Sequence, residues 1–142
     1  MATSSKLDSP RRQVLVVDDD KHLQFLASRI LKEAGYDVDS AADGGTALEK
    51  IRNRRPDLVV LDITLPSLDG RAVLDRLQKF ASPPPVLVLT AHGHNFAGAE
   101  AVRQQAAGLM AKPFSLRDFL AACERILARR VSPDSSGETR RG

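Results

Sequence analysis

Three segments of the chain are continuously apolar: residues 14–17, 58–61 and 86–89. Strands that are buried on both faces have such sequences, as the central strands of a parallel sheet do. Acidic residues occupy every second position of residues 36–40, which predicts a half-exposed strand at one edge of the sheet. The short apolar segment 109–111 predicts a strand at the other edge.

Helical periodicity separates these predicted strands. Apolar residues of segment 23–34 recur at intervals of three and four, and Gly35 follows as a helix-ending residue. Segment 115–130 repeats the pattern and begins with a capping signal, S-x-x-D. Weaker helical patterns occupy three more segments: 44–54, 70–80 and about 95–107. The last of these contains Gly98, and an internal glycine costs about 1 kcal/mol relative to alanine.

The alternation of strand and helix signals predicts an α/β fold. We expect a flavodoxin-like, doubly wound (βα)5 domain whose five-stranded parallel sheet has the order 2-1-3-4-5. A chain of 142 residues fits one such domain. We assign residues 13–130 to the domain and expect flexible tails at residues 1–12 and 131–142.

Composition narrows the class of protein further. The chain is 42% apolar and 27% charged, as globular proteins are, and it contains no apolar stretch near the ~20 residues that cross a bilayer. Its polar opening segment lacks the apolar core of a signal peptide. Cys123 is the single cysteine, which agrees with a reducing compartment. We therefore expect a cytoplasmic protein without a membrane partner.

The positive charge of the chain is concentrated near its ends. The net charge is +3 and the pI about 9.4. Residues 1–12 and residues 129–142 carry +2 each, which leaves about −1 for the part between them. Because this pattern gives the folded part no basic stripe, we expect no direct contact with nucleic acid.

Chemically active side chains follow four of the five predicted strands: Asp18, Asp19 and Asp20 the first, Asp62 the third, Thr90 the fourth and Lys112 the fifth. In an open parallel sheet, ligands bind at the carboxyl ends of the strands. Clustered carboxylates repel one another unless a cation lies between them, and Mg²⁺ favours carboxylate and phosphate oxygens. An aspartate beside such an ion can attack phosphorus, while an ammonium and a hydroxyl group neutralise the phosphoryl oxygens.

Four motifs carry a resemblance to a known family: V-V-D-D at 16–19, L-D-I-T-L-P-S-L-D-G at 61–70, T-A at 90–91 and K-P-F at 112–114. In this order and at these spacings, they resemble the receiver domain of response regulators, over about residues 13 to 130. The likeness is to the stand-alone, chemotaxis-regulator type.

The resemblance implies a role for each site residue. Asp62 is then the phosphoacceptor and a ligand of Mg²⁺, with Thr90 and Lys112 completing the catalytic set. Asp19 binds the metal directly and Asp18 largely through water. The backbone carbonyl of Thr64 is the remaining metal ligand, and the peptide bond between Lys112 and Pro113 is cis.

Three positions depart from the pattern of the family. Leu109 stands where receivers usually have the tyrosine or phenylalanine that swings inward on activation. Gln105 and Ala106 replace the usual glycine and alanine before the last strand. His92 lies two residues after Thr90, at a position where the family tunes the lifetime of the phosphorylated state. Our hypothesis is that an imidazole at this position makes that lifetime depend on pH.

The resemblance also implies the partners. The phosphoryl donor is a sensor histidine kinase or a histidine phosphotransfer protein, and the domain catalyses its own aspartyl phosphorylation and dephosphorylation without being a conventional enzyme. Because the chain leaves no room for a DNA-binding domain after residue 130, we expect output through protein contacts or onward phosphotransfer. We expect a monomer, or a weak dimer through segments 95–107, 109–111 and 115–130.

Alternatives remain open at this point. A binding module that keeps the fold but works without phosphorylation is favoured by Leu109 and Gln105 and opposed by the complete acid set. A hydrolase of the aspartyl-phosphate type needs D-x-D-x-T, and the sequence Asp62-Ile63-Thr64 lacks the second acid. A dinucleotide-binding protein needs G-x-G-x-x-G after the first strand, and the sequence has none there.

Overall fold

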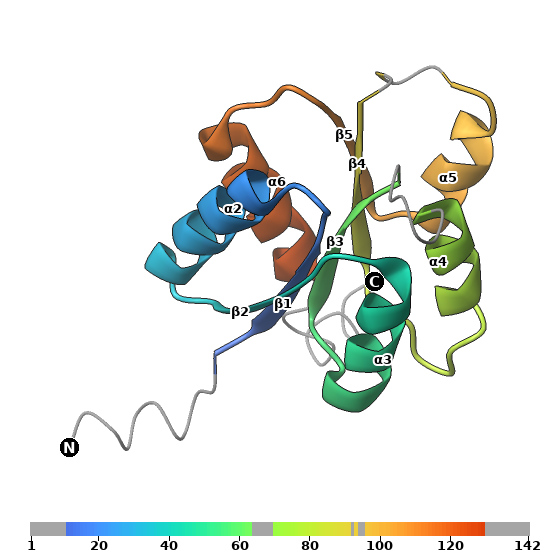
Figure 1. Ribbon diagram of the computed structural model, residues 1–142, viewed down its shortest axis with the longest axis horizontal. Helices are drawn as coiled ribbons and strands as arrows, with labels where there is room; N and C mark the ends of the chain where they lie inside the picture. Colours follow the sequence, from blue (N-terminus) through green and yellow to red (C-terminus); the bar gives the residue numbers. More distant parts are fainter. Residues whose placement is uncertain (1–10, 64–69, 92, 94–95, 130–142) are drawn as a thin grey trace, which may run out of the picture.

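A computed structural model of the protein describes residues 11–63, 70–91, 93 and 96–129. Strands and helices alternate along the described chain (Figure 1). The strands are β1 (Gln13–Val17), β2 (Asp37–Ala41), β3 (Leu58–Asp62), β4 (Val86–Thr90) and β5 (Gly108–Ala111). The helices are α2 (Lys21–Glu33), α3 (Gly44–Arg54), α4 (Gly70–Leu77), α5 (Ala99–Gln105) and α6 (Leu116–Arg129).

The five strands form one parallel sheet in the order β2-β1-β3-β4-β5, which confirms the predicted topology. In Figure 1, α2 and α6 cover one face of the sheet, and α3, α4 and α5 cover the other. Every residue of β3 and β4 is buried, because these strands have neighbours on both sides and helices on both faces. Two apolar cores result, one on each face of the sheet.

Local capping explains where several of the helices begin and end. The carboxylate of Asp20 accepts hydrogen bonds at the start of α2, and that of Asp43 accepts one from the N–H of Thr46 at the start of α3. After α2, Gly35 has a φ of 102°, a left-handed conformation that glycine adopts without strain. The hydroxyl of Ser115 accepts a bond from the N–H of Asp118 at the start of α6, as the capping signal predicted.

Two helices are shorter than the sequence predicted. Helix α4 ends at Leu77 rather than at residue 80, because the N–H groups of the next residues bond carbonyls three positions back and tighten the chain into turns. Helix α5 covers seven residues rather than 95–107. Gly98 precedes it with a φ of 85°, so the glycine begins the helix instead of lying inside it.

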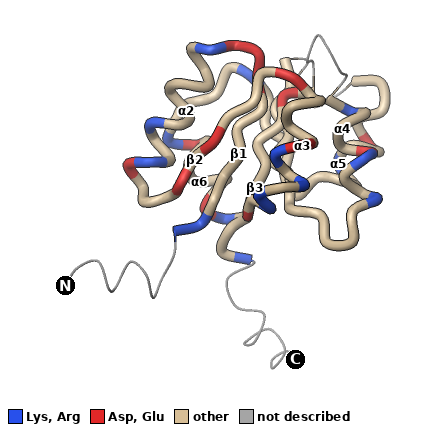
Figure 2. Tube along the Cα trace, turned by 60° about the horizontal axis from the view of Figure 1, so that its bottom comes forward, with Lys and Arg blue, Asp and Glu red and all other residues tan. Residues whose placement is uncertain are grey.

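The described part of the chain shows opposite charges at the two ends of strand β1, which lies between β2 and β3. Arg11 and Arg12 precede this strand, and three aspartates follow it (Figure 2). None of the helices within 11–63, 70–91 and 96–129 is long and apolar enough to cross a membrane. The predicted tails, 1–12 and 131–142, lie almost wholly outside the described residues.

Candidate functional site

Three consecutive aspartates occupy the loop that leads from β1 into α2. Asp20 is exposed, and its Oδ1 accepts hydrogen bonds from the N–H groups of His22 and Leu23 at 2.9 and 3.2 Å. This residue therefore caps α2. Asp18 is fully buried and Asp19 is exposed, and the cap leaves both carboxylates available for another role.

Asp62 ends β3, the central strand of the sheet, and is 2% exposed. Because β3 pairs with β1, the loop after β1 lies beside the end of β3. One carboxylate oxygen each of Asp18, Asp19 and Asp62 lies within 4.8 Å of the other two. The fold thus brings Asp62 beside two neighbouring acids that lie far from it in the sequence.

Lys112 approaches this acidic cluster from the direction of β5, the edge strand beyond β4. It follows β5, and its Nζ lies 3.0 Å from Oδ2 of Asp62 and 3.3 Å from Oδ2 of Asp18. The peptide bond between Lys112 and Pro113 is cis, as the resemblance implied. The backbone N–H of Lys112 donates to the carbonyl of Thr90 at 2.8 Å, which ties the ends of β4 and β5 together.

Thr90 is the last residue of β4 and is fully buried. In the parallel register Asp62 pairs with Leu89, so Thr90 lies one residue further along the neighbouring strand. The same edge of the sheet therefore carries carboxylates, an ammonium group and this threonine.

Burial and charge shape the electrostatics of the cluster. Burial raises the pKa of Asp18; the N–H of Asp20 opposes this effect, the charge of Asp62 reinforces it, and Lys112 opposes it. Burial alone would lower the pKa of Lys112, but its bond to Asp62 and the charge of Asp18 raise it above the ordinary value. The lysine therefore stays an ammonium group at neutral pH, and three carboxylates face one positive charge.

The donor set fits a hard divalent cation. Mg²⁺ takes oxygen ligands and is usually held by one or two carboxylates together with waters and phosphate oxygens. The cluster offers carboxylate oxygens from Asp18, Asp19 and Asp62 at mutual distances below 4.8 Å. A divalent cation balances the charge that Lys112 leaves uncompensated, so the residues present fit a magnesium ion.

Gly70 supports this site in a way that the sequence motif alone did not reveal. It begins α4, and a Cβ at this position would lie 2.3 Å from Cα of Ile63 and 2.6 Å from the carbonyl oxygen of Asp62. Such contacts with the backbone are too short for any side chain. The glycine therefore allows α4 to start directly against the end of β3.

The remaining positions singled out in the sequence fall into two groups. Thr64 and His92 lie outside the described residues. Leu109 packs against the core shared by β1, β3, α3 and α4, and Gln105 donates a hydrogen bond from Nε2 to Oδ1 of Asp75 on α4 at 2.9 Å. At these two departures from the usual receiver pattern, the side chains thus make contacts within the fold.

Comparison with known families gives the same assignment. Residues 14–124 match the family described as the response regulator receiver domain. Response regulator MprA of Mycobacterium sp. (strain KMS) is 41% identical over 134 residues, which cover 89% of this chain and 55% of that protein. The alkaline phosphatase synthesis transcriptional regulatory protein PhoP of Bacillus subtilis (strain 168) is 40% identical over 118 residues, which cover 83% of this chain and 49% of that protein.

Solved structures show the same fold. The receiver domain of NtrX from Brucella abortus is 36% identical with a TM-score of 0.74, and the match covers 81% of this chain and 98% of that one. The receiver domain of the Francisella response regulator 1452 is 30% identical with a TM-score of 0.78, covering 84% and 99%. The chain spans about half the length of the curated relatives it matches, so the stand-alone arrangement stays a prediction.

Proposed function

Because this chain belongs to the response regulator receiver domain family of two-component systems, we propose that Asp62 accepts a phosphoryl group from a histidine kinase or a histidine phosphotransfer protein. A carboxylate oxygen of Asp62 attacks phosphorus, an O–P bond forms, and the N–P bond of the donor phosphohistidine breaks. The histidine leaves with the electron pair of that bond, and the product is an aspartyl phosphate.

The acidic cluster is the proposed magnesium site. Asp18, Asp19 and Asp62 supply carboxylate oxygens, and the carbonyl of Thr64 is a further proposed ligand. When bound, the ion neutralises negative charge on the phosphoryl oxygens. Asp18 is fully buried, and its Oδ1 accepts a hydrogen bond from the N–H of Asp20 at 2.9 Å, so its carboxylate is held in place for the ion.

Lys112 and Thr90 are proposed to bind the transferred group. The Nζ of Lys112 already lies 3.0 Å from Oδ2 of Asp62 and needs a small shift to reach a phosphoryl oxygen. Thr90, buried at the end of the next strand, offers a hydroxyl donor. Phosphoryl transfer depends mainly on such positioning and charge neutralisation.

The proposed output is a changed binding surface. Helix α5 is short, starts at a glycine and follows the strand that ends in Thr90, so it is the element we expect phosphorylation to shift. Protein contacts through α5, β5 and α6, either with a partner or with a second copy, transmit the signal. Contact with nucleic acid is not part of this proposal.

The proposal depends above all on Lys112, because its ammonium group joins two buried acids of the site. The test is incubation of the protein with acetyl phosphate, with Mg²⁺ or with a chelator, followed by measurement of intact mass. We expect one labile phosphoryl group in the presence of Mg²⁺ and none with the chelator. Equal labelling under both conditions would contradict a magnesium-dependent transfer.

A further inference from the structure

Gln24 joins the two loops beside the acidic cluster. It lies on the first turn of α2, partly buried, and its side-chain Nε2 donates hydrogen bonds to the backbone carbonyls of Asp18 and Ala41, the latter at 3.1 Å. A glutamine amide carries two N–H donors on one nitrogen. Both donors are therefore used, and each reaches a carbonyl at the carboxyl end of a different strand.

These bonds complete the immobilisation of Asp18. Its backbone N–H donates to the carbonyl of Ala41 at 3.1 Å, its Oδ1 accepts from the N–H of Asp20 at 2.9 Å, and its Oδ2 accepts from Lys112. The carbonyl oxygen is the remaining polar atom of this residue, and Gln24 holds it. Every polar atom of the buried Asp18 thus has a partner.

Holding this carbonyl also fixes the residue that follows. The carbonyl of Asp18 belongs to the peptide plane that contains the N–H and Cα of Asp19, and the plane is rigid. Asp19 is exposed and has no comparable packing, yet its carboxylate must face the other two acids. The orientation of the plane sets the N–Cα bond of Asp19, so only rotation about that bond remains to direct its side chain from the backbone.

We propose that Gln24 is a positioning residue of the magnesium site: its amide fixes the peptide plane between Asp18 and Asp19 and so aims the Asp19 carboxylate at the cation. This inference deepens the proposed function and rests on it. Gln24 itself touches neither the cation nor the phosphoryl group. Mutation of residues that orient metal ligands in this way typically lowers metal affinity by about 10–100-fold.

The inference predicts a specific loss in Gln24→Met. Methionine is also long and unbranched, so it fills similar space without donating a hydrogen bond. We expect Mg²⁺ affinity to fall about 10-fold, measured by isothermal titration of the unphosphorylated protein with MgCl₂. The Mg²⁺ concentration for half-maximal phosphorylation by acetyl phosphate should rise equally, while the rate at saturating Mg²⁺ stays within about twofold. Gln24→His keeps one N–H donor, so we expect its Mg²⁺ affinity to lie between those of the wild type and Gln24→Met.

Gln78→Met is the matched control. The Nε2 of Gln78 also donates to a backbone carbonyl, that of Leu74 at 3.4 Å, but it lies just beyond the end of α4 away from Asp62. We expect its Mg²⁺ affinity to equal that of the wild type. If Gln24→Met binds Mg²⁺ as tightly as the wild type and loses only thermal stability, Gln24 has a merely structural role and the inference is wrong.

A measurement on the wild type serves if Gln24→Met does not fold. In a titration with Mg²⁺ followed by NMR, the side-chain amide of Gln24 and the backbone amide of Asp19 should shift together, and the side-chain amide of Gln78 should not. An unmoved Gln24 amide would overturn the inference but leave the proposed function standing. Absence of any Mg²⁺ binding by the wild type would remove both.

Discussion

The Nζ of Lys112 lies 3.0 Å from Oδ2 of Asp62, although 50 residues separate them in the chain. Between the strands that carry them lies β4, so the lysine side chain crosses the end of that strand to reach the acid. The parallel sheet places the carboxyl ends of β3 and β5 at the same edge, and this brings the two residues together. The pair therefore links the fold directly to the proposed chemistry.

Lys112→Met should slow phosphorylation of Asp62 by acetyl phosphate by about 100-fold, the usual effect of removing one charged or hydrogen-bonding group from a transition state. The reason is that the variant leaves the phosphoryl oxygens without their ammonium partner. Initial rates by mass spectrometry at saturating Mg²⁺ measure the effect. Lys50→Met is the control. The Nζ of Lys50 lies 3.0 Å from Oδ1 of Asp39, and this ion pair is not part of the acidic cluster. Equal rates in the two variants would contradict the role given to Lys112.

Gly70→Ala should destabilise the protein by about 1–3 kcal/mol, the typical cost of overpacking. The added Cβ would collide with the backbone of Asp62 and Ile63, so the phosphorylation rate should fall as well. Urea unfolding followed by circular dichroism gives the free energy of unfolding. In the control Gly45→Ala, the new Cβ lies 3.5 Å from the nearest side-chain atom, and we expect a change below about 1 kcal/mol. A Gly70→Ala protein as stable as Gly45→Ala would show that the close approach of α4 is not required.

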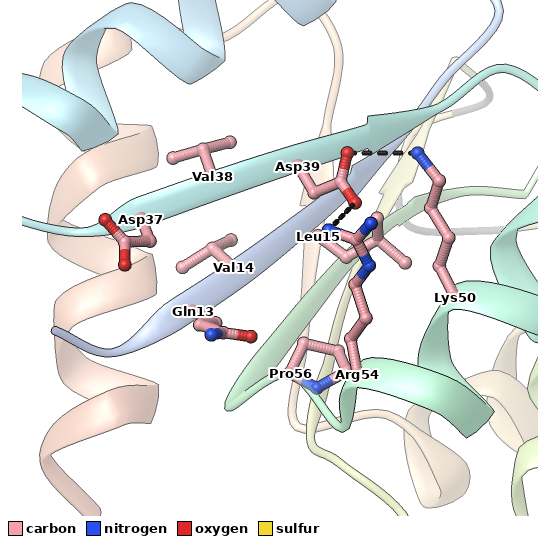
Figure 3. Close-up of a pocket in the computed structure, with 9 residues that line it drawn as sticks. All are labelled: Gln13, Val14, Leu15, Asp37, Val38, Asp39, Lys50, Arg54 and Pro56. Carbon is pink, nitrogen blue, oxygen red and sulfur yellow. Dashed lines mark hydrogen bonds and ion pairs between the residues drawn. The ribbon is translucent and has the colours of Figure 1, made fainter. Parts of the chain in front are cut away.

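Asp39 lies in a second polar cluster, at the edge of the sheet beside α3. It lines a cavity of about 470 Å³ together with Lys50 and Arg54 (Figure 3). Its Oδ1 accepts from Lys50 at 3.0 Å and from the N–H of Ser40 at 2.8 Å, and Arg54 lies 3.2 Å from its Oδ2. Burial pushes the pKa of Asp39 upward, but the bonds to Lys50 and Ser40 outweigh it, so the pKa is lowered from 3.8.

The lowered pKa gives Asp39 a predictable pH dependence. Because the folded state binds the proton less readily than the unfolded state, this carboxylate stabilises the fold above pH 3.8 and loses that contribution as the pH falls through its lowered pKa. Asp39→Asn should therefore cost about 0.5–1 kcal/mol at pH 7, a modest value because the side chain is one-third exposed. In urea unfolding near pH 2 the difference from the wild type should shrink. A difference that is the same at both pH values would refute the ion-pair explanation.

Cys123 should be inert in the folded protein. It is fully buried on α6, and burial together with the charge of Glu124 raises the pKa of its thiol to about 12. Because the thiolate is the reactive form, a disulfide reagent at pH 8 should label the native protein far more slowly than a free thiol. In urea the labelling should become rapid. Rapid labelling without denaturant would contradict the burial of this cysteine.

The central elements of the fold could be predicted because their sequences leave little choice. Continuous apolar runs such as 58–61 and 86–89 require burial on both faces, and capping residues such as Ser115 set helix ends locally. Asp18, Asp62 and Lys112 could be placed together because strand ends in a parallel sheet share one edge. Each of these inferences depends on a local pattern or on a general rule of sheet topology.

Other features depend on contacts that no local pattern contains. The start of α5 is set by the left-handed Gly98, and the end of α4 by turns that follow Leu77. The role proposed for Gln24 arises because α2 lies beside the ends of two strands. From its position in the helical pattern alone, Gln24 would be taken for an ordinary polar surface residue. The alternating pattern correctly predicted a half-exposed strand at the edge of the sheet, but it contained no sign that Lys50 and Arg54 of α3 pair with Asp39.

The most direct test of the account locates the phosphoryl group itself. The protein is phosphorylated with acetyl phosphate and Mg²⁺, the aspartyl phosphate is reduced with borohydride to mark its position, and the modified residue is identified by tandem mass spectrometry of peptides. We predict modification at Asp62, and its loss in Asp62→Asn and after chelation of Mg²⁺. Modification at Asp18 or Asp19 in the wild type, or none under any of these conditions, would contradict the assignment of Asp62 as the phosphoacceptor.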